Sequence, residues 1–330
     1  MPLPPRTVVA DRGDAGRRID LVVRRHLTDL ARATRTRVQS WIEGGRVSVN
    51  GLVVRRASAR AALDDVIVVE LPDEQPRAEV RPEPGALERL FEDEHFLIVS
   101  KPAGVVSHPT FRHPEGSLLN VVLWHAREWP RGQRPSLVGR LDKLTSGAIA
   151  IAKTTTAHAR LQRTLLSSFA EKSYLAVVYG PVDRERGTID LRLRRHPDDR
   201  RRVIATKDDG LESLTRFQRI AESTIAGCPV ALVRCQIITG RMHQVRVHMA
   251  ASGWPLIGDP KYGEPRWQDA AEGIDRDYLR DFPRQALHAW RLAFVHPFTS
   301  ERVEVEASIP EDLNELLRRC GLSALPTSAL

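Results

Sequence analysis

Apolar residues near the start of the chain recur at the spacing of two amphipathic helices. Thr34 is a good N-cap for the second helix, and Gly44-Gly45 would end it. Alternating residues at 46–54, with a type I′ turn at Asn50-Gly51, predict a hairpin, and a third strand is predicted at 66–71. The apolar helical positions are Ile19, Val22, Val23, Leu27, Leu30, Val38, Trp41 and Ile42.

These elements predict a small α/β domain over residues 16–72, followed by a proline- and charge-rich linker at 73–87. Strands and helices then mix without a strict βαβ alternation. We therefore expect an α+β domain at 88–312, with a central mixed or antiparallel sheet flanked by helices. Residues 313–330 are predicted to be a C-terminal tail that frays after Leu317. The charged stretch 263–283, which has few aliphatic residues, predicts a surface insertion.

The composition points to an anionic partner and away from metal and membrane. The 330 residues carry a formal charge of +8, which favours a nucleic acid as partner. Only six of the 50 cations are lysine, an arginine bias that a GC-rich genome would also produce. Cysteines lack a Cys-x-x-Cys spacing, and His243 and His248 would point in different directions on a helix, so we expect no disulfide framework and no metal. No apolar run approaches a membrane span or secretory signal, and we expect a cytoplasmic monomer. The cysteines are Cys228, Cys235 and Cys320.

Asp142 is the first candidate for chemistry. It lies between Arg140 and Lys143, directly before an apolar strand predicted at 148–153. If the partner is a polyanion, a carboxylate set among cations suits chemistry better than it suits holding that partner, and a loop before a strand supports it rigidly. The alternative is a structural turn in which Asp142 accepts hydrogen bonds from backbone N–H groups near Ser146-Gly147.

Two later segments add candidates. The strand predicted at 172–180 presents Tyr174, which on its own pattern is a packed aromatic residue. The segment 239–250 predicts a helix, and Arg246 flanks its apolar face, a position that a helix with merely solvated cations does not explain. The apolar positions of that helix are Met242, Val245 and Met249.

Four arginines cluster at the start of the second N-terminal helix and in the turn after it: Arg32, Arg35, Arg37 and Arg46. Helix N-terminal N–H groups would add to their attraction for phosphate, although a solvated helix face is the simpler alternative. Residues 18–20 and 34–51 resemble an S4 RNA-binding domain almost position for position. That resemblance implies that the four arginines bind structured RNA.

Six motifs in the second domain resemble, in chain order, those of the RluA-type pseudouridine synthases, and they span about 190 residues. They are Lys101-Pro-Ala-Gly104, Arg140-Leu-Asp-x-x-Thr-Ser-Gly147, Lys172-x-Tyr-x-Ala-x-Val-x-Gly180, Thr239-Gly-Arg-x-His-Gln-x-Arg-Val-His248, Pro255-Leu-Ile-Gly-Asp-Pro-Lys-Tyr-Gly263 and Leu287-His-Ala289.

The resemblance implies isomerisation of uridine to pseudouridine within RNA, without cofactor or metal. The aspartate that matches Asp142 is essential in such enzymes, as a nucleophile or as a base, and the arginine that matches Arg246 pairs with it. Tyr174 matches a tyrosine that packs on the target base and assists proton transfer at C5. Large-subunit ribosomal RNA is the expected target because the S4-like domain accompanies such members, and transfer RNA is the alternative.

The resemblance also implies substrate contacts. Arg140 would be a wedge or phosphate contact, Arg241 and His243 would support the loop or backbone, and Leu287 would line the uracil pocket. One departure is that Gly139 stands where the family usually has histidine, which puts the choice of RNA in question.

Two other classes of function were weighed against this one. A non-catalytic RNA-binding or ribosome-assembly factor could retain the fold, but the three catalytic matches are all present. A glycosidase-like enzyme acting on free nucleosides would not need the arginine-rich N-terminal domain.

Overall fold

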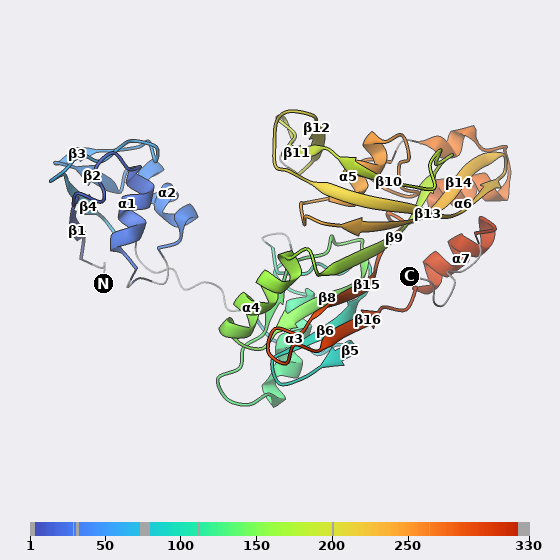
Figure 1. Cartoon of the computed structure of the whole chain (residues 1–330), viewed down its shortest axis with the longest axis horizontal. Helices are drawn as coiled ribbons and strands as arrows, with labels where there is room; N and C mark the ends of the chain where they lie inside the picture. The colour runs from blue at the N-terminus through green and yellow to red at the C-terminus, as the bar shows by residue number, and fades with distance from the viewer. Residues whose placement is uncertain are drawn as a thin grey trace. The chain divides into compact units, whose positions relative to one another are not determined.

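The computed structural model describes residues 4–28, 30, 33–72, 80–110, 113–199, 201–263 and 265–322. The chain divides into two compact units, Met1–Glu79 and Val80–Leu330, and each is described by itself (Figure 1).

The first unit is a four-stranded antiparallel sheet, in the order β1-β4-β2-β3, with two helices that pack against it. The two predicted helices and the hairpin are confirmed. Asn50 and Gly51 have φ angles of 51° and 81°, the left-handed pair that a type I′ turn requires. The elements are β1 Arg6–Val9, α1 Ile19–His26, α2 Arg35–Glu43, β2 Val47–Val49, β3 Leu52–Val53 and β4 Val66–Val69.

Strand β1 was not predicted, and it lies before the domain boundary placed at residue 16. It pairs with β4 over its whole length, from Arg6 opposite Val69 to Val9 opposite Val66. Four residues are too few to show a period, so only the partner strand identifies it as part of the sheet. The N-terminal boundary at 16 is therefore too late.

The second unit contains a ten-stranded sheet whose main path runs β10-β13-β14-β9-β15-β8-β6-β5. Strands β15 and β8 are parallel and the other pairs are antiparallel, so the predicted α+β class with a mixed sheet is confirmed. Its strands are β5 Glu88–Glu92, β6 Phe96–Lys101, β7 Ser136–Val138, β8 Ser146–Ala152, β9 Glu171–Tyr179, β10 Arg186–Asp190, β13 Leu214–Ile225, β14 Cys228–Ile237, β15 Leu287–Val295 and β16 Arg302–Glu306.

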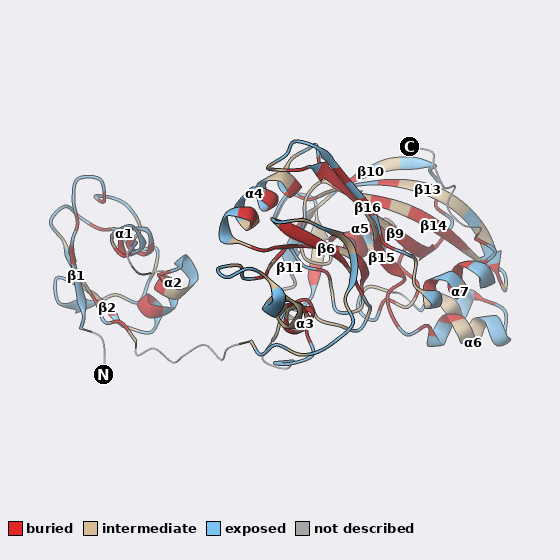
Figure 2. Ribbon diagram, turned by 90° about the horizontal axis from the view of Figure 1, so that it is seen from below, coloured by how far each residue is buried: buried red, intermediate tan, exposed pale blue. Residues whose placement is uncertain are grey.

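Helices cover both faces of this sheet, and its central strands are buried along most of their length (Figure 2). In β9, Leu175 and Val177 face a cluster that includes residues of α6 and α7, whereas Ala176 and Val178 face α5. The remaining elements are α3 Leu118–His125, η1 Ala126–Glu128, α4 Thr155–Leu166, β11 Arg192–Arg195, β12 Val203–Thr206, α5 Gln244–Ala251, η2 Arg266–Asp269, α6 Ile274–Asp281 and α7 Glu311–Arg319. No described helix has the length and apolar character needed to cross a membrane.

Two expectations about the C-terminal region are wrong. Residues 313–319 are not a tail outside the domain, because α7 buries Leu313, Leu316 and Leu317 against the sheet. Their i, i+3, i+4 spacing is that of a helix, a signal that a prediction from chain position alone does not use. The stretch 263–283 is not purely a surface insertion either, since Leu279 of α6 is 1% exposed in the same cluster.

Candidate active site

The loop that carries Asp142 joins β7 to β8, and its backbone is held by the segment 101–107. Buried Lys101 donates from Nζ to the carbonyl of Lys143 (3.3 Å) as well as to two carbonyls of its own loop. Ser107 Oγ donates to the carbonyl of Leu141 (2.9 Å) and accepts from the N–H of Leu141 (3.1 Å). The peptide groups on both sides of Asp142 are thus anchored, so the carboxylate is presented from a rigid support.

A structural turn made by the Asp142 side chain is not what the loop uses. The N–H of Thr145 bonds to the main-chain carbonyl of Asp142 (3.1 Å). Within the described parts of the chain, no backbone N–H donates to its carboxylate, which instead accepts from Arg246. The side chain is 17% exposed and remains available for chemistry.

Gly147, the second residue of β8, lets two strands meet. Its φ is 114°, and a Cβ there would lie 2.2 Å from the carbonyl oxygen of Ala289. Strand β15 therefore approaches β8 in parallel register, with Ala289 opposite Gly147, only because residue 147 has no side chain.

Arg246, in the first turn of α5, connects two carboxylates. Its NH1 donates to Asp142 Oδ2 (2.8 Å), and Nε and NH2 each donate to Asp259 at 2.7 Å. Asp259 is fully buried and also accepts from two backbone N–H groups, those of Lys261 (2.9 Å) and Tyr262 (3.1 Å). The bidentate pair fixes the plane of the guanidinium, so its remaining edge points at Asp142.

Arg246 and Asp259 both stay charged although they are buried. Burial acts to lower the pKa of Arg246, but the hydrogen bonds and charge of Asp259, and then those of Asp142, raise it above its usual value. Burial acts to raise the pKa of Asp259, yet Arg246 and the two backbone N–H groups hold it below its usual value. Arg246 therefore stays a cation beside Asp142 at every physiological pH.

His243 is a second neighbour of Asp142, and it is neutral. Burial lowers its pKa to about 4. Tyr262 Oη lies 2.7 Å from His243 Nδ1 and accepts a hydrogen bond from the N–H of Val203 (2.9 Å). The Tyr262 hydroxyl therefore donates its hydrogen to Nδ1, which acts as the acceptor. The ring then carries its proton on Nε2, 3.8 Å from Asp142 Oδ1.

Asp142 lies on the wall between two hollows. The first, of about 350 Å³, is mainly apolar, and Tyr174 lines it from β9. Burial and then the charge of Asp142 raise the pKa of Tyr174 well above its usual value, so the phenol keeps its proton. Its hydroxyl has no hydrogen-bond partner in the described residues. The apolar lining includes Val138, Leu141, Ile149, Ile237, Met242 and Leu292.

The second hollow, of about 390 Å³, has four cations among its polar and apolar lining residues. Arg140, Lys143 and Lys261 line it together with Asp142 and Arg246. The two hollows share Arg140, Leu141, Asp142 and His243, so Asp142 can be approached from the side of Tyr174 and from the side of Lys143 and Lys261.

The structure brings most of the predicted site residues together. Asp142 and Arg246 are in contact, and Tyr174, Arg140, Arg241 and His243 line the first hollow with Asp142.

Leu287 does not line either hollow. It is 4% exposed and lies in the core opposite Ala176, while Ala289, two residues further along β15, reaches the first hollow. Helix α5 also starts at Gln244, later than predicted, because His243 has a left-handed φ of 56°. Met242 therefore precedes the helix and lines the first hollow.

Sequence reasoning assigned no role to Asp259 and Tyr262. Both lie in the motif 255–263, where an acid between Gly258 and Pro260 in an otherwise apolar turn was the available signal. Their partners, Arg246 and His243, are more than ten residues away, so spacing alone could not pair them.

The predicted RNA-binding arginines lie in the first unit. Arg35 and Arg46 are exposed and Arg37 is partly exposed, whereas Arg32 lies outside the described residues. Arg35 is 3.6 Å from the buried carboxylate of Asp20, so part of its charge is used within the unit.

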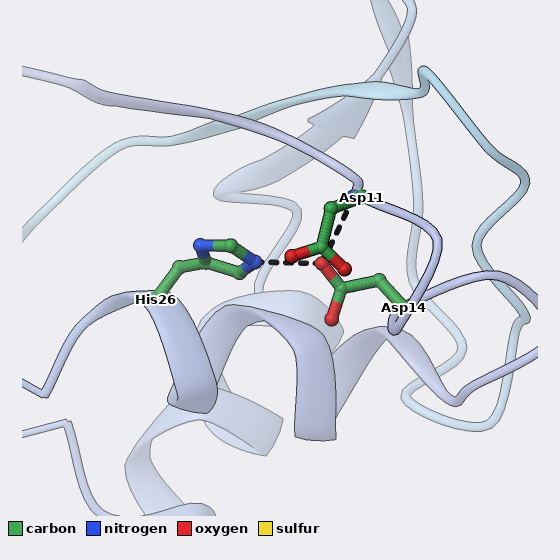
Figure 3. Close-up of side chains that lie close together, drawn as sticks. All are labelled: Asp11, Asp14 and His26. Carbon is green, nitrogen blue, oxygen red and sulfur yellow. Dashed lines mark hydrogen bonds and ion pairs between the residues drawn. The ribbon is translucent and has the colours of Figure 1, made fainter.

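One cluster in the first unit has the residue types of a metal site. Ligand atoms of Asp11, Asp14 and His26 lie within 4.8 Å of one another (Figure 3). Arg25 NH1, however, donates to both Asp11 (2.9 Å) and Asp14 (2.7 Å), and His26 Nε2 is 2.6 Å from Asp14. Burial acts to raise the pKa of Asp14, but these partners lower it to about 2. Arg25 pairs with both carboxylates and His26 contacts one of them, so the cluster is a network of internal pairs.

The sequence of residues 95–251 matches the family described as RNA pseudouridylate synthase. The chain is 39% identical over 290 residues to "Uncharacterized RNA pseudouridine synthase YlyB" of Bacillus subtilis, covering 86% of this chain and 88% of that protein. It is 36% identical to "Ribosomal large subunit pseudouridine synthase D" of Neisseria meningitidis, covering 96% and 82% of the two chains.

A solved structure shows the same similarity. A human protein, RNA Pseudouridylate Synthase Domain Containing 1, superposes with a TM-score of 0.53 and 26% identity, covering 74% of this chain and 99% of that chain.

Proposed function

Because this chain belongs to the RNA pseudouridylate synthase family, we propose that it converts uridine to pseudouridine in large-subunit ribosomal RNA. The observation that carries the proposal is the carboxylate of Asp142, which Arg246 holds at the mouth of an apolar hollow. Several relatives named ribosomal large subunit pseudouridine synthase D, at 36% and 38% identity, support the ribosomal target.

The site supports a division of roles. Asp142, kept beside a permanent cation, acts as an anion, either attacking the substrate or removing a proton from the ribose. The apolar hollow takes the flipped uracil, and the ring of Tyr174 offsets part of the unstacking cost. Since Tyr174 is a phenol rather than a phenolate, it enters as a hydrogen-bond donor and relays the C5 proton rather than serving as a pre-formed base.

Two substitutions separate the ring of Tyr174 from its hydroxyl. Tyr174→Phe keeps the ring, so we expect KM to change little while kcat falls about 100-fold or more. Tyr174→Leu also removes the stacking surface and should raise KM about tenfold or more. Steady-state tritium release from RNA labelled at uridine C5 measures both constants. Equal KM and kcat for wild type and both variants would remove Tyr174 from the reaction.

We further propose that the first unit is an S4-like RNA-binding domain and that the second unit, which includes α7, is the catalytic domain. Of the predicted linker at 73–87, residues 73–79 lie outside the described residues. The support for the S4-like domain is the arginine cluster at α2, whose N-terminus adds favourable partial charge for phosphate. Arg37 and Arg46 have no acidic partner among the described residues. The three free, buried cysteines fit the proposed cytoplasmic location, where thiols stay reduced.

The salt dependence of RNA binding tests this domain. Arg37→Gln combined with Arg46→Gln should weaken binding and reduce the slope of log Kd against log salt by about 0.7 to 0.9 for each lost phosphate contact. The control is Arg12→Gln combined with Arg17→Gln, which removes the same amount of charge. Arg12 and Arg17 are exposed and lie between β1 and α1. Identical slopes for both double variants and wild type would give the first unit another role.

A further inference from the structure

The second hollow beside Asp142 concentrates positive charge. Arg140, Lys143 and Lys261 line it, and the acid that lines it, Asp142, is already paired with Arg246. Arg246 pairs with both Asp142 and Asp259, so these three groups together carry one negative charge. The three cations Arg140, Lys143 and Lys261 exceed this charge, so the groups around the hollow of about 390 Å³ are net positive.

These cations are available to a ligand. Arg140 and Lys143 are exposed, and neither side chain has a hydrogen bond or ion pair within the residues that the structure describes. Lys261 donates from Nζ to the carbonyl of Arg201 (3.0 Å), which leaves two of its three N–H bonds free. Burial, and then the charge of Arg246, lower the pKa of Lys261, as expected where positive charges gather.

The contrast with the first hollow is chemical. Tyr174 in the lining of the first hollow offers a base a stacking surface, whereas the only aromatic rings in the described lining of the second hollow are the imidazoles of His108 and His243. A nucleotide whose ribose faces Asp142 presents its base and its phosphates in different directions. A base in the apolar hollow therefore leaves the phosphodiester facing the other side of the wall.

We propose that the second hollow is a phosphate subsite, in which Lys143 and Lys261 bind the phosphodiester next to the target uridine. This inference rests on the proposed function and deepens it, since it assigns the phosphate of the flipped nucleotide to the second hollow. Lys143 follows Asp142 in the chain, so the phosphate contact and the carboxylate are positioned by the same anchored loop. Binding the phosphate there holds the ribose against Asp142.

The test is the salt dependence of kcat/KM for tritium release from a large-subunit ribosomal RNA transcript labelled at uridine C5. Lys143→Gln and Lys261→Gln should each raise KM roughly tenfold, because each removes a charge-assisted hydrogen bond, while kcat changes less than threefold. Each should also flatten the slope of log kcat/KM against log salt by about 0.7 to 0.9. Lys143→Arg keeps the charge, so its slope of log kcat/KM against log salt should equal that of wild type.

Lys207→Gln is the matched control, since Lys207 is an exposed lysine of the same unit that lines neither hollow. It should leave KM and the slope at wild-type values. If wild type is active and the two test variants keep its slope, or if Lys207→Gln changes the slope as much as they do, the subsite is wrong. If wild type itself releases no tritium, the proposed function fails first.

Discussion

Asp142→Asn should abolish turnover, with kcat falling by at least about 10⁴-fold, because an amide neither attacks a sugar or base nor accepts a proton at this position. The change keeps the shape of the side chain, and Arg246 retains its bidentate pair with Asp259. We therefore expect a thermal midpoint within a few degrees of wild type. RNA affinity should be unchanged or slightly higher, since the lost charge opposes phosphate.

Single-turnover tritium release and filter binding of the same RNA measure the two effects separately. Asp183→Asn is a suitable control, because Asp183 is an exposed acid of the same unit and lines neither hollow. Activity of Asp142→Asn within tenfold of wild type would exclude Asp142 as the essential group.

Arg246→Met should damage both stability and activity. Asp259 would remain fully buried without its counter-charge, which costs about 3–5 kcal/mol of unfolding free energy. Asp142 would lose the hydrogen bond that aims it, and we expect kcat to fall about 100-fold or more. Chemical denaturation and tritium release, measured on the same preparation, give the two numbers.

A double variant separates these losses. In Arg246→Met with Asp259→Asn the buried charge is gone, and the amide oxygen can still accept from the N–H groups of Lys261 and Tyr262. Most of the stability should return, while activity stays low because nothing orients Asp142. Full recovery of activity in the double variant would mean that Arg246 acts only through the fold.

Local pattern predicted much of the fold because the helices and strands carry their own period. The second helix of the first unit, the hairpin at Asn50-Gly51 and β9 follow from spacing and turn chemistry. Strand β1 could not be found this way, since four residues acquire meaning only from β4. The residues of α7 have the period of a helix, but the tail was predicted from chain position alone.

The site residues likewise divide into those that the sequence predicted and those that it did not. Asp142 and Arg246 were found because their motifs are specific, although 104 residues separate them. Asp259 was missed because its role depends on a buried guanidinium supplied by another element, which spacing does not reveal. Leu287 was placed in the pocket by resemblance, but the register of β15 buries it against Ala176.

The most direct test of the central claim is tritium release by wild type from ribosomal RNA labelled at uridine C5, with transfer RNA supplied in parallel. Forming the bond between C5 and the ribose expels that hydrogen, so the account predicts release from ribosomal RNA, one equivalent per modified uridine, and pseudouridine in the digested product. No release from either RNA, with the protein folded and binding both, would contradict it and favour a non-catalytic RNA-binding role.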